Sequence, residues 1–213
     1  MPVKTNLQNI RQELGTVKLV AVTKYAAPEQ VRELLEAGHF VLGENKVQST
    51  ARKAEQYQQY PVQWHMLGHL QTNKVKQAVQ IFEIIQSVDS AKTAAAIDKE
   101  AAKIGKVQKI LLQVNIGREP QKSGAAPELL AELLVYCKEL KNIRLLGLMA
   151  LAPDLPDKEL TRPYFREMKR LYDLHAAPYG LEILSLGMSG DYPVAVQEGA
   201  NMVRIGSKIF AGK

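Results

Sequence analysis

Apolar runs of strand length alternate with amphipathic helical stretches from one end of this chain to the other. That alternation is typical of βα units around a parallel sheet. Eight runs qualify, preceded by a helix over residues 4–14 that Gly15 can end. They cover residues 18–22, 40–43, 63–67, 83–87, 108–114, 143–149, 182–187 and 202–206. The sequence therefore predicts an α/β fold, a single (β/α)8 TIM barrel with an extra N-terminal helix, in which residues 1–213 form one domain.

An open, doubly wound sheet is the main alternative to a closed barrel. A dinucleotide-binding fold of that kind would place a Gly-rich phosphate loop after its first strand, and none follows residue 22. The stretch from Pro153 to Pro156 predicts a loop after the sixth strand rather than a linker between domains.

Composition limits the cellular setting. Apolar runs are far shorter than the roughly 20 residues of a membrane span, and no apolar signal core follows Met1. A lone cysteine, Cys137, cannot form an internal disulfide. The net charge of +6 comes from dispersed basic residues without aromatic-plus-basic stacking motifs, which indicates a solvated surface rather than nucleic-acid binding. We expect a cytoplasmic protein that binds neither membranes nor nucleic acid.

Polar residues just after the apolar runs are the informative ones, because the active site of a β/α barrel lies at the C-terminal ends of its strands. Lys24 follows the first run, whereas Lys18 opens the same run and belongs at the opposite end. A lysine at the mouth would be partly desolvated, which favours the neutral, nucleophilic amine. From position alone, Lys24 suits a solvated strand end as well as it suits a Schiff-base lysine.

Two pairs of glycine and serine on consecutive strands indicate a phosphate site. Ser189-Gly190 follows the seventh run, and Gly206-Ser207 follows the eighth. Phosphate sites in these barrels often lie there, where backbone N–H groups and hydroxyls can donate. In a closed barrel the eighth strand pairs with the first, so Arg204 should face the same volume as Lys24. An aldehyde for the lysine, an aromatic nitrogen for the arginine and a phosphate for the serines are the three groups of pyridoxal 5'-phosphate (PLP).

Plainer interpretations remain for some of these residues. Without its neighbours, Arg204 would be interpreted as part of a strand-end ion pair with Glu44 or Asp191. His65 is expected to line the mouth, and His69 is expected to be structural or at the surface. The two histidines lack the glutamate of a zinc-protease helix, so no metal site is predicted.

Motifs spread over nearly the whole chain together resemble a known family. They include Leu19-Val20-Ala21-Val22-Thr23-Lys24, Gly43-Glu44-Asn45 with Gln48, Trp64-His65 followed by Gly68, Gly147-Leu148-Met149, Gly187-Met188-Ser189 and Val203-Arg204-Ile205-Gly206-Ser207. In these motifs the chain resembles the pyridoxal-phosphate homeostasis proteins, the group of YggS, PROSC and PipY.

The resemblance implies a fold like the N-terminal barrel domain of alanine racemase, with PLP held as a Schiff base on Lys24. It also implies that Arg204 faces the pyridine nitrogen, that Asn45 lies beside the ring, and that Ser189, Gly206 and Ser207 surround the phosphate. The full predicted cofactor-binding set is Lys24, Asn45, His65, Met188, Ser189, Gly190, Arg204, Gly206 and Ser207.

The residues favour a carrier over an enzyme. Arginine stays protonated, so Arg204 can only donate to the pyridine nitrogen, which makes the cofactor a poor electron sink. A racemase also needs acid/base groups on both faces of its substrate, and Tyr25 should point away from the mouth by strand alternation. We therefore expect a protein of intracellular PLP homeostasis, a carrier or regulator without appreciable amino-acid turnover.

Two other functions stay open at this point. A PLP-dependent, racemase-like enzyme acting on a small amino acid would use Lys24 as one of its bases, and a cofactor-free aldolase would use the same lysine without PLP. The expected partners are PLP and, as recipients of it, PLP-dependent apoenzymes. No exposed apolar helix is evident in the sequence, which favours a monomer.

Overall fold

Eight parallel strands close into a barrel in the computed structural model, which describes residues 2–211. The strands are β1 (Lys18–Val22), β2 (Val41–Glu44), β3 (Gln63–Met66), β4 (Ile84–Val88), β5 (Gln108–Val114), β6 (Ile143–Ala150), β7 (Ile183–Ser185) and β8 (Met202–Ile205). Neighbours in the chain are neighbours in the barrel, and β8 returns to pair with β1. The predicted TIM barrel is therefore confirmed.

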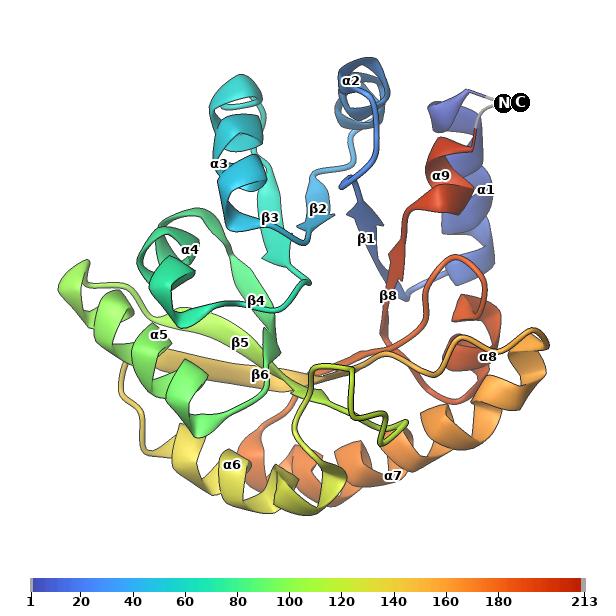
Figure 1. Cartoon of the computed structure of the whole chain (residues 1–213). Helices are drawn as coiled ribbons and strands as arrows, with labels where there is room; N and C mark the ends of the chain where they lie inside the picture. The colour runs from blue at the N-terminus through green and yellow to red at the C-terminus, as the bar shows by residue number, and fades with distance from the viewer. Residues whose placement is uncertain (1, 212–213) are drawn as a thin grey trace.

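Helices lie outside the barrel and cover its strands (Figure 1). The α-helices are α1 (Val3–Leu14), α2 (Pro28–Glu36), α3 (Val47–Gln56), α4 (Val75–Ile81), α5 (Ala91–Lys103), α6 (Leu130–Lys138), α7 (Arg162–Tyr179), α8 (Tyr192–Gln197) and α9 (Ser207–Phe210). Short 3-10 helices occur at η1 (Thr72–Lys74), η2 (Pro127–Leu129) and η3 (Lys158–Thr161). No helix within residues 2–211 is long and apolar enough to cross a membrane.

The N-terminal helix α1 lies beside α9, the helix that follows the last strand (Figure 1). It ends at Gly15, whose φ of 56° is a conformation that glycine adopts without steric cost. Asn6 on α1 donates from Nδ2 to the carbonyl of Ile209 on α9, over 3.0 Å. Helix α1 therefore holds α9, the segment that follows β8, in place.

Strand β7 is shorter than the sequence predicts. Residues 182–187 were expected to form it, and only Ile183–Ser185 do. Gly187 has a φ of 85°, and a Cβ at this residue would lie 2.7 Å from the Cα of Tyr192. The glycine thus turns the chain out of the sheet and lets α8 pack closely against the turn. This turn starts the loop that carries Ser189.

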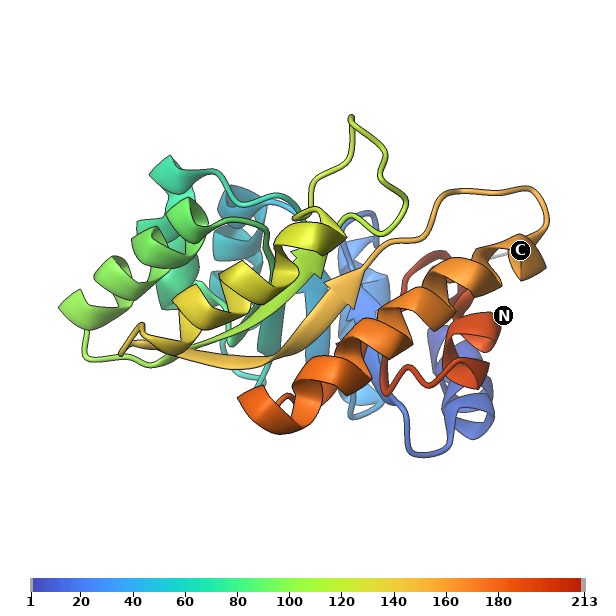
Figure 2. The ribbon, with the colours of Figure 1, turned by 90° about the horizontal axis from the view of Figure 1, so that it is seen from below.

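Apolar side chains fill both faces of the strands, as expected of parallel strands that helices cover. One cluster lies between the strands and the helices, and a smaller one fills the barrel with Val20, Ile84, Leu111, Leu146, Met149, Ile183 and Met202. In Figure 2 the connections after β5 and β6 project from one side of the barrel. The loops at this C-terminal end surround the candidate site.

Gly147 on β6 is the position where the barrel wall tolerates a side chain least. A Cβ there would lie 1.8 Å from the carbonyl oxygen of Ile183 on β7, a backbone atom that cannot move without breaking the pairing of the two strands. Gly147→Ala should lower the free energy of unfolding by about 3 kcal/mol or more through overpacking.

Thermal unfolding of Gly147→Ala, followed by circular dichroism, checks this expectation. Gly117→Ala is the control, because the atoms nearest to a Cβ at Gly117 belong to the side chains of Glu119 and Pro153 and lie 3.0 Å or more away. A midpoint for Gly147→Ala equal to that of the wild type would show that β6 and β7 are not packed as described.

Candidate functional site

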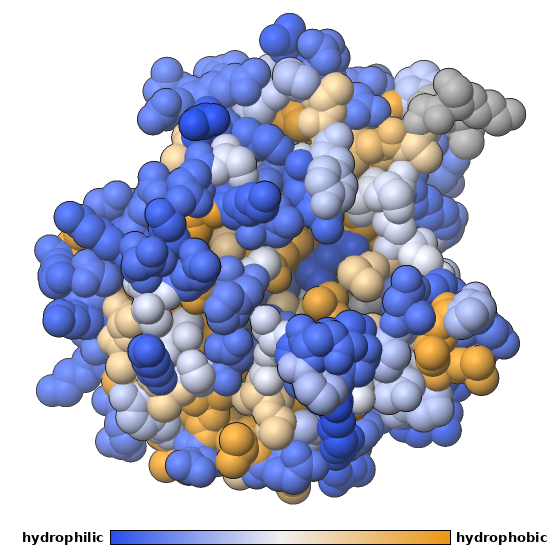
Figure 3. Space-filling model, viewed as in Figure 1, coloured by the Kyte–Doolittle hydropathy of each residue, from blue (hydrophilic) through white to orange (hydrophobic). Residues whose placement is uncertain are grey.

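A cavity of about 570 Å³ opens at the C-terminal mouth of the barrel, between the ends of β1 and β8 and the loop after β7. In the space-filling view a hollow with a hydrophilic floor opens near the middle of this face (Figure 3). Most of the residues that the sequence predicts for the site line this cavity. They are Lys24, Met188, Ser189, Gly190, Arg204, Gly206 and Ser207.

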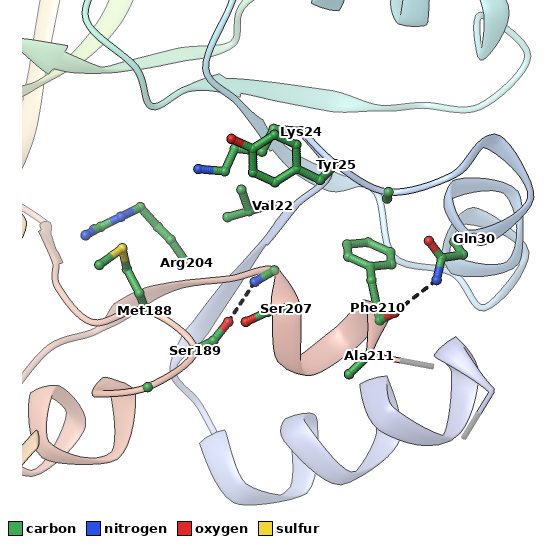
Figure 4. A pocket seen from close by; sticks show the side chains of 13 residues that line it. Val22, Lys24, Tyr25, Gln30, Met188, Ser189, Arg204, Ser207, Phe210 and Ala211 are labelled. Carbon is green, nitrogen blue, oxygen red and sulfur yellow. Dashed lines mark hydrogen bonds between the residues drawn. The ribbon is translucent and has the colours of Figure 1, made fainter. Parts of the chain in front are cut away.

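Lys24 lies just beyond the end of β1, and its side chain extends in the same direction as that of Arg204 (Figure 4). The residue is exposed, whereas a partly desolvated lysine was expected. The difference arises because β1 ends at Val22, so Lys24 lies on the open rim of the barrel rather than within its wall. The chain itself therefore leaves the amine accessible to a ligand in the cavity.

Tyr25 lines the same cavity, which corrects the expectation that it points away. Strand alternation cannot be extended to this residue, because the extended backbone of β1 stops three residues earlier. The Nζ atom of Lys24 lies 5.0 Å from the centre of the Tyr25 ring, and the tyrosine is 88% exposed. Tyr25 thus forms part of the rim, on the same side of the cavity as the lysine.

Arg204 is a buried cation with only neutral hydrogen-bond acceptors. Its Nη1 donates to Oγ of Ser185 over 2.5 Å, and its Nη2 donates to the carbonyl of Ala150 over 2.8 Å. Burial lowers the pKa of Arg204 to about 10, and the nearby charge of Asp191 opposes that shift. No carboxylate in residues 2–211 forms an ion pair with this guanidinium. The buried charge therefore faces the cavity without an anionic partner.

The two acidic residues considered as ion-pair partners for Arg204 have other roles. Glu44 accepts hydrogen bonds from Thr23 and Lys53 through Oε1. Asp191 accepts one from the backbone N–H of Met188 through Oδ1, over 2.6 Å, and so holds the loop after β7 in shape.

The two loops predicted to bind phosphate meet at Ser189. Its Oγ accepts hydrogen bonds from the backbone N–H groups of Gly206, at 3.1 Å, and Lys208, at 3.4 Å. The link from Ser189 to Gly206 is drawn in Figure 4. Two backbone donors and a hydroxyl therefore converge at one point of the cavity wall, an arrangement that suits an anion's oxygen atoms.

His65 does not line this cavity, which corrects the expectation from the sequence that it lies at the mouth. It lies inside the barrel on β3, where it pairs with Gly43 and Ile84, and it lines the cavity at the opposite end, to which Lys18 also contributes. Its depth follows from the register of β3, which periodicity alone does not give. Burial lowers the pKa of His65 to about 4, so the ring is neutral near pH 7.

A chain of hydrogen bonds inside the barrel connects His65 with Arg204. Ser185, which accepts from Arg204, donates to Oε1 of Gln86 over 2.7 Å. Gln86 Nε2 lies 2.9 Å from Nδ1 of His65, and because an amide nitrogen can only donate, the ring proton must be on Nε2. All four side chains are buried.

Asn45 lies in a separate hollow beside the mouth, together with Lys46, Gln48 and His69. The backbone of Gly68 fits tightly against Asn45, since a Cβ on Gly68 would lie 2.4 Å from the carbonyl oxygen of Asn45. Asn45 thus does not line the cavity to which Lys24 contributes.

Other reactive residues serve local structure. Nδ1 of His69 lies 3.5 Å from Oδ2 of Asp89, and residues 2–211 contain no cluster of three or more potential metal ligands. Burial raises the pKa of the Cys137 thiol to about 11, so the residue stays protonated.

Six lining residues are outside the set predicted from the sequence: Val22, Tyr25, Ala26, Gln30, Phe210 and Ala211. Gln30 donates from Nε2 to the carbonyl of Phe210 over 3.0 Å, which joins α2 to the end of α9 (Figure 4). The position of Tyr25 next to Lys24 was a usable signal. No local pattern connects residues 30 and 210, which only the closure of the barrel brings together.

Comparison with known proteins places this architecture in a family. The profile of the alanine racemase N-terminal domain matches residues 2–213. A pyridoxal phosphate homeostasis protein of Aquifex aeolicus is 43% identical over 195 residues, which are 91% of this chain and 86% of that protein.

Solved structures agree with this assignment. PipY of Synechococcus elongatus, solved with PLP bound, is 34% identical and superposes with a TM-score of 0.91 over 98% of this chain and 100% of PipY. The alanine racemase of Clostridium difficile shares the fold, with a TM-score of 0.84 at 19% identity, over 100% of this chain and 60% of the racemase. The chain therefore belongs to the family of pyridoxal phosphate homeostasis proteins, built on the barrel of the alanine racemase N-terminal domain.

Proposed function

We propose that this chain binds PLP in the cavity beside Lys24, as a Schiff base, and acts in intracellular PLP homeostasis as a carrier or regulator. The observation that carries the proposal is that one cavity holds the exposed amine of Lys24 and the buried guanidinium of Arg204. Similarity to PipY, which was solved with PLP bound, and to the pyridoxal phosphate homeostasis protein of Aquifex aeolicus supports the proposal.

The donor groups around the cavity fit the three functional groups of PLP. Arg204 uses Nη1 and Nη2 within the protein, and its Nε forms no hydrogen bond within residues 2–211, so Nε–H remains for a ring nitrogen. The N–H groups of Gly206 and Lys208 would turn from Ser189 to phosphate oxygens, with the serine hydroxyl as a further donor.

Lys24 is proposed to hold the cofactor covalently. Its neutral amine adds to the aldehyde carbon, a C=N bond replaces the C=O bond, and the oxygen leaves as water. When bound, PLP supplies an electron-withdrawing ring conjugated to that C=N bond. Arg204 remains protonated near pH 7 even with its pKa lowered to about 10, so it donates to the ring nitrogen without protonating it.

The arrangement of proton-transfer groups favours a carrier over a racemase-like enzyme. A racemase needs a proton donor on the substrate face opposite its base. Apart from Arg204 and two serines, Lys24 and Tyr25 are the side chains of the described lining that can exchange a proton. Both lie on the same side of the cavity, with Lys24 Nζ over the Tyr25 ring. We therefore propose that the protein lacks appreciable amino-acid turnover.

The proposed setting follows from the same role. We propose a cytoplasmic, single-domain monomer that delivers PLP to PLP-dependent apoenzymes, since the exposed rim beside Lys24 leaves a bound cofactor accessible to an acceptor. The alternative function is a racemase-like enzyme, and exchange of the α-hydrogen of an amino acid distinguishes it from a carrier.

Purified protein incubated with PLP should show the absorption of a lysine-bound pyridoxal group, and borohydride should abolish that absorption. Peptide mass mapping should then find the reduced phosphopyridoxyl group on Lys24. Lys24→Ala should lose the label, whereas Lys18→Ala, at the other end of β1, should keep it. Labelling of a different lysine in the wild type would contradict the proposal.

The PLP-loaded protein should not exchange the α-hydrogen of alanine in deuterated water above the rate of free PLP. Mass spectrometry of the recovered alanine measures the exchange. Steady deuterium incorporation by the wild type that is lost in both Lys24→Ala and Tyr25→Phe would replace the carrier with a racemase-like enzyme that uses the two residues.

A further inference from the structure

Thr23, the residue directly before Lys24, is fixed at every one of its polar atoms. The last residue of β1 is Val22, so Thr23 is the one residue between the strand and Lys24. Its N–H donates to the carbonyl of Gly43 over 3.0 Å, and its own carbonyl accepts from the N–H of Ala26 over 3.1 Å. The residue is fully buried, whereas Lys24 is exposed.

The remaining contacts of Thr23 come from an ion pair between Lys53 on α3 and Glu44 on β2. Nζ of Lys53 donates to the carbonyl of Thr23 over 2.7 Å and to Oε1 of Glu44 over 2.6 Å. The hydroxyl of Thr23 donates to the same Oε1 over 2.6 Å. The Glu44 side chain is 1% exposed and that of Lys53 is 20% exposed. The three residues form a closed triangle of short hydrogen bonds.

Stability alone does not account for this triangle. A buried ion pair is weak evidence for stability, because apolar residues of similar volume often serve equally well. An apolar pair could not, however, bind the carbonyl of Thr23, which belongs to the peptide group joined to Lys24. The ammonium of Lys53 and the N–H of Ala26 both bind the carbonyl of that peptide group. The plane of the peptide group, together with the φ of Lys24, sets the direction in which the Lys24 side chain leaves the backbone.

We propose that Lys53 is a positioning residue for Lys24, held against the Thr23 carbonyl by Glu44. Fixing this peptide plane before a ligand arrives reduces the ordering cost of bringing the Lys24 amine to an aldehyde carbon in the cavity. The inference rests on the proposed function of Lys24, to which it adds a residue of a neighbouring helix that does not line the cavity.

The test compares the rate of covalent PLP capture at Lys24, by borohydride trapping and mass mapping, in the wild type and in the double variant Lys53→Met with Glu44→Gln. The double substitution avoids leaving a buried carboxylate without its partner, so roughly the wild-type thermal midpoint is expected. Loss of the peptide anchor should slow capture about tenfold in the folded protein. If the variant unfolds in buffer, the measurement is made in an osmolyte that restores its circular-dichroism spectrum.

A control removes a more exposed ion pair far from Lys24. Lys109 on β5 and Glu83, which directly precedes β4, pair over 2.5 Å and line the cavity at the opposite end of the barrel. Lys109→Met with Glu83→Gln should capture PLP within about twofold of the wild-type rate, as expected for a distant, independent site.

The outcomes separate the two proposals. Slower capture by the folded Lys53 variant, with the Lys109 variant near the wild type, supports the positioning role. Equal capture by the folded Lys53 variant and the wild type overturns it and leaves the proposed function intact. Absence of the label from Lys24 in the wild type overturns both.

Discussion

The pairing of β8 with β1 is the interaction on which the rest of the molecule depends. Its register places Val20 opposite Arg204 and Ala21 opposite Ile205. The two strands are also tightly packed at the mouth, because a Cβ on Gly206 would lie 3.0 Å from the carbonyl oxygen of Val22. An unclosed sheet would expose two strand edges and would separate the lysine from the arginine. The closed barrel removes both edges and creates the cavity in the same step.

Much of this architecture could be predicted from the sequence, because parallel strands that helices cover are apolar on both faces. Such strands stand out as uninterrupted runs, and in a barrel all their C-terminal ends lie together. This is why Lys24, Arg204 and the loops at Ser189 and Gly206 could be assigned to one end of the fold. Each of these residues follows or closes an apolar run, so its place along the barrel axis is encoded locally.

Other residues could not be placed, because their positions depend on where a strand stops and how it is shifted. Tyr25 and Lys24 lie beyond Val22, the last residue of β1, where strand alternation no longer predicts the direction of a side chain, and Lys24 is exposed there. His65 lies deep inside the barrel because of the register of β3. It is connected to Arg204 through hydrogen bonds by way of Gln86 and Ser185. The hydrogen bond from Lys53 on α3 to the carbonyl of Thr23, after β1, joins two separate elements, so the periodicity of the sequence could not predict it.

The closure of the barrel also determines when the site comes into existence. A ribosome makes the chain from its N-terminus, so Lys24 emerges long before residues 204–207 have been synthesised. Until β8 is added, β1 has an unpaired edge, and α1 lacks the helix whose carbonyl its Asn6 binds. Until residue 204 has been added, Lys24 has no arginine of β8 beside it. Only the finished barrel brings the guanidinium of Arg204, the backbone donors after β8 and the Ser189 hydroxyl to the cavity that Lys24 lines, so the proposed capture of PLP requires the completed molecule.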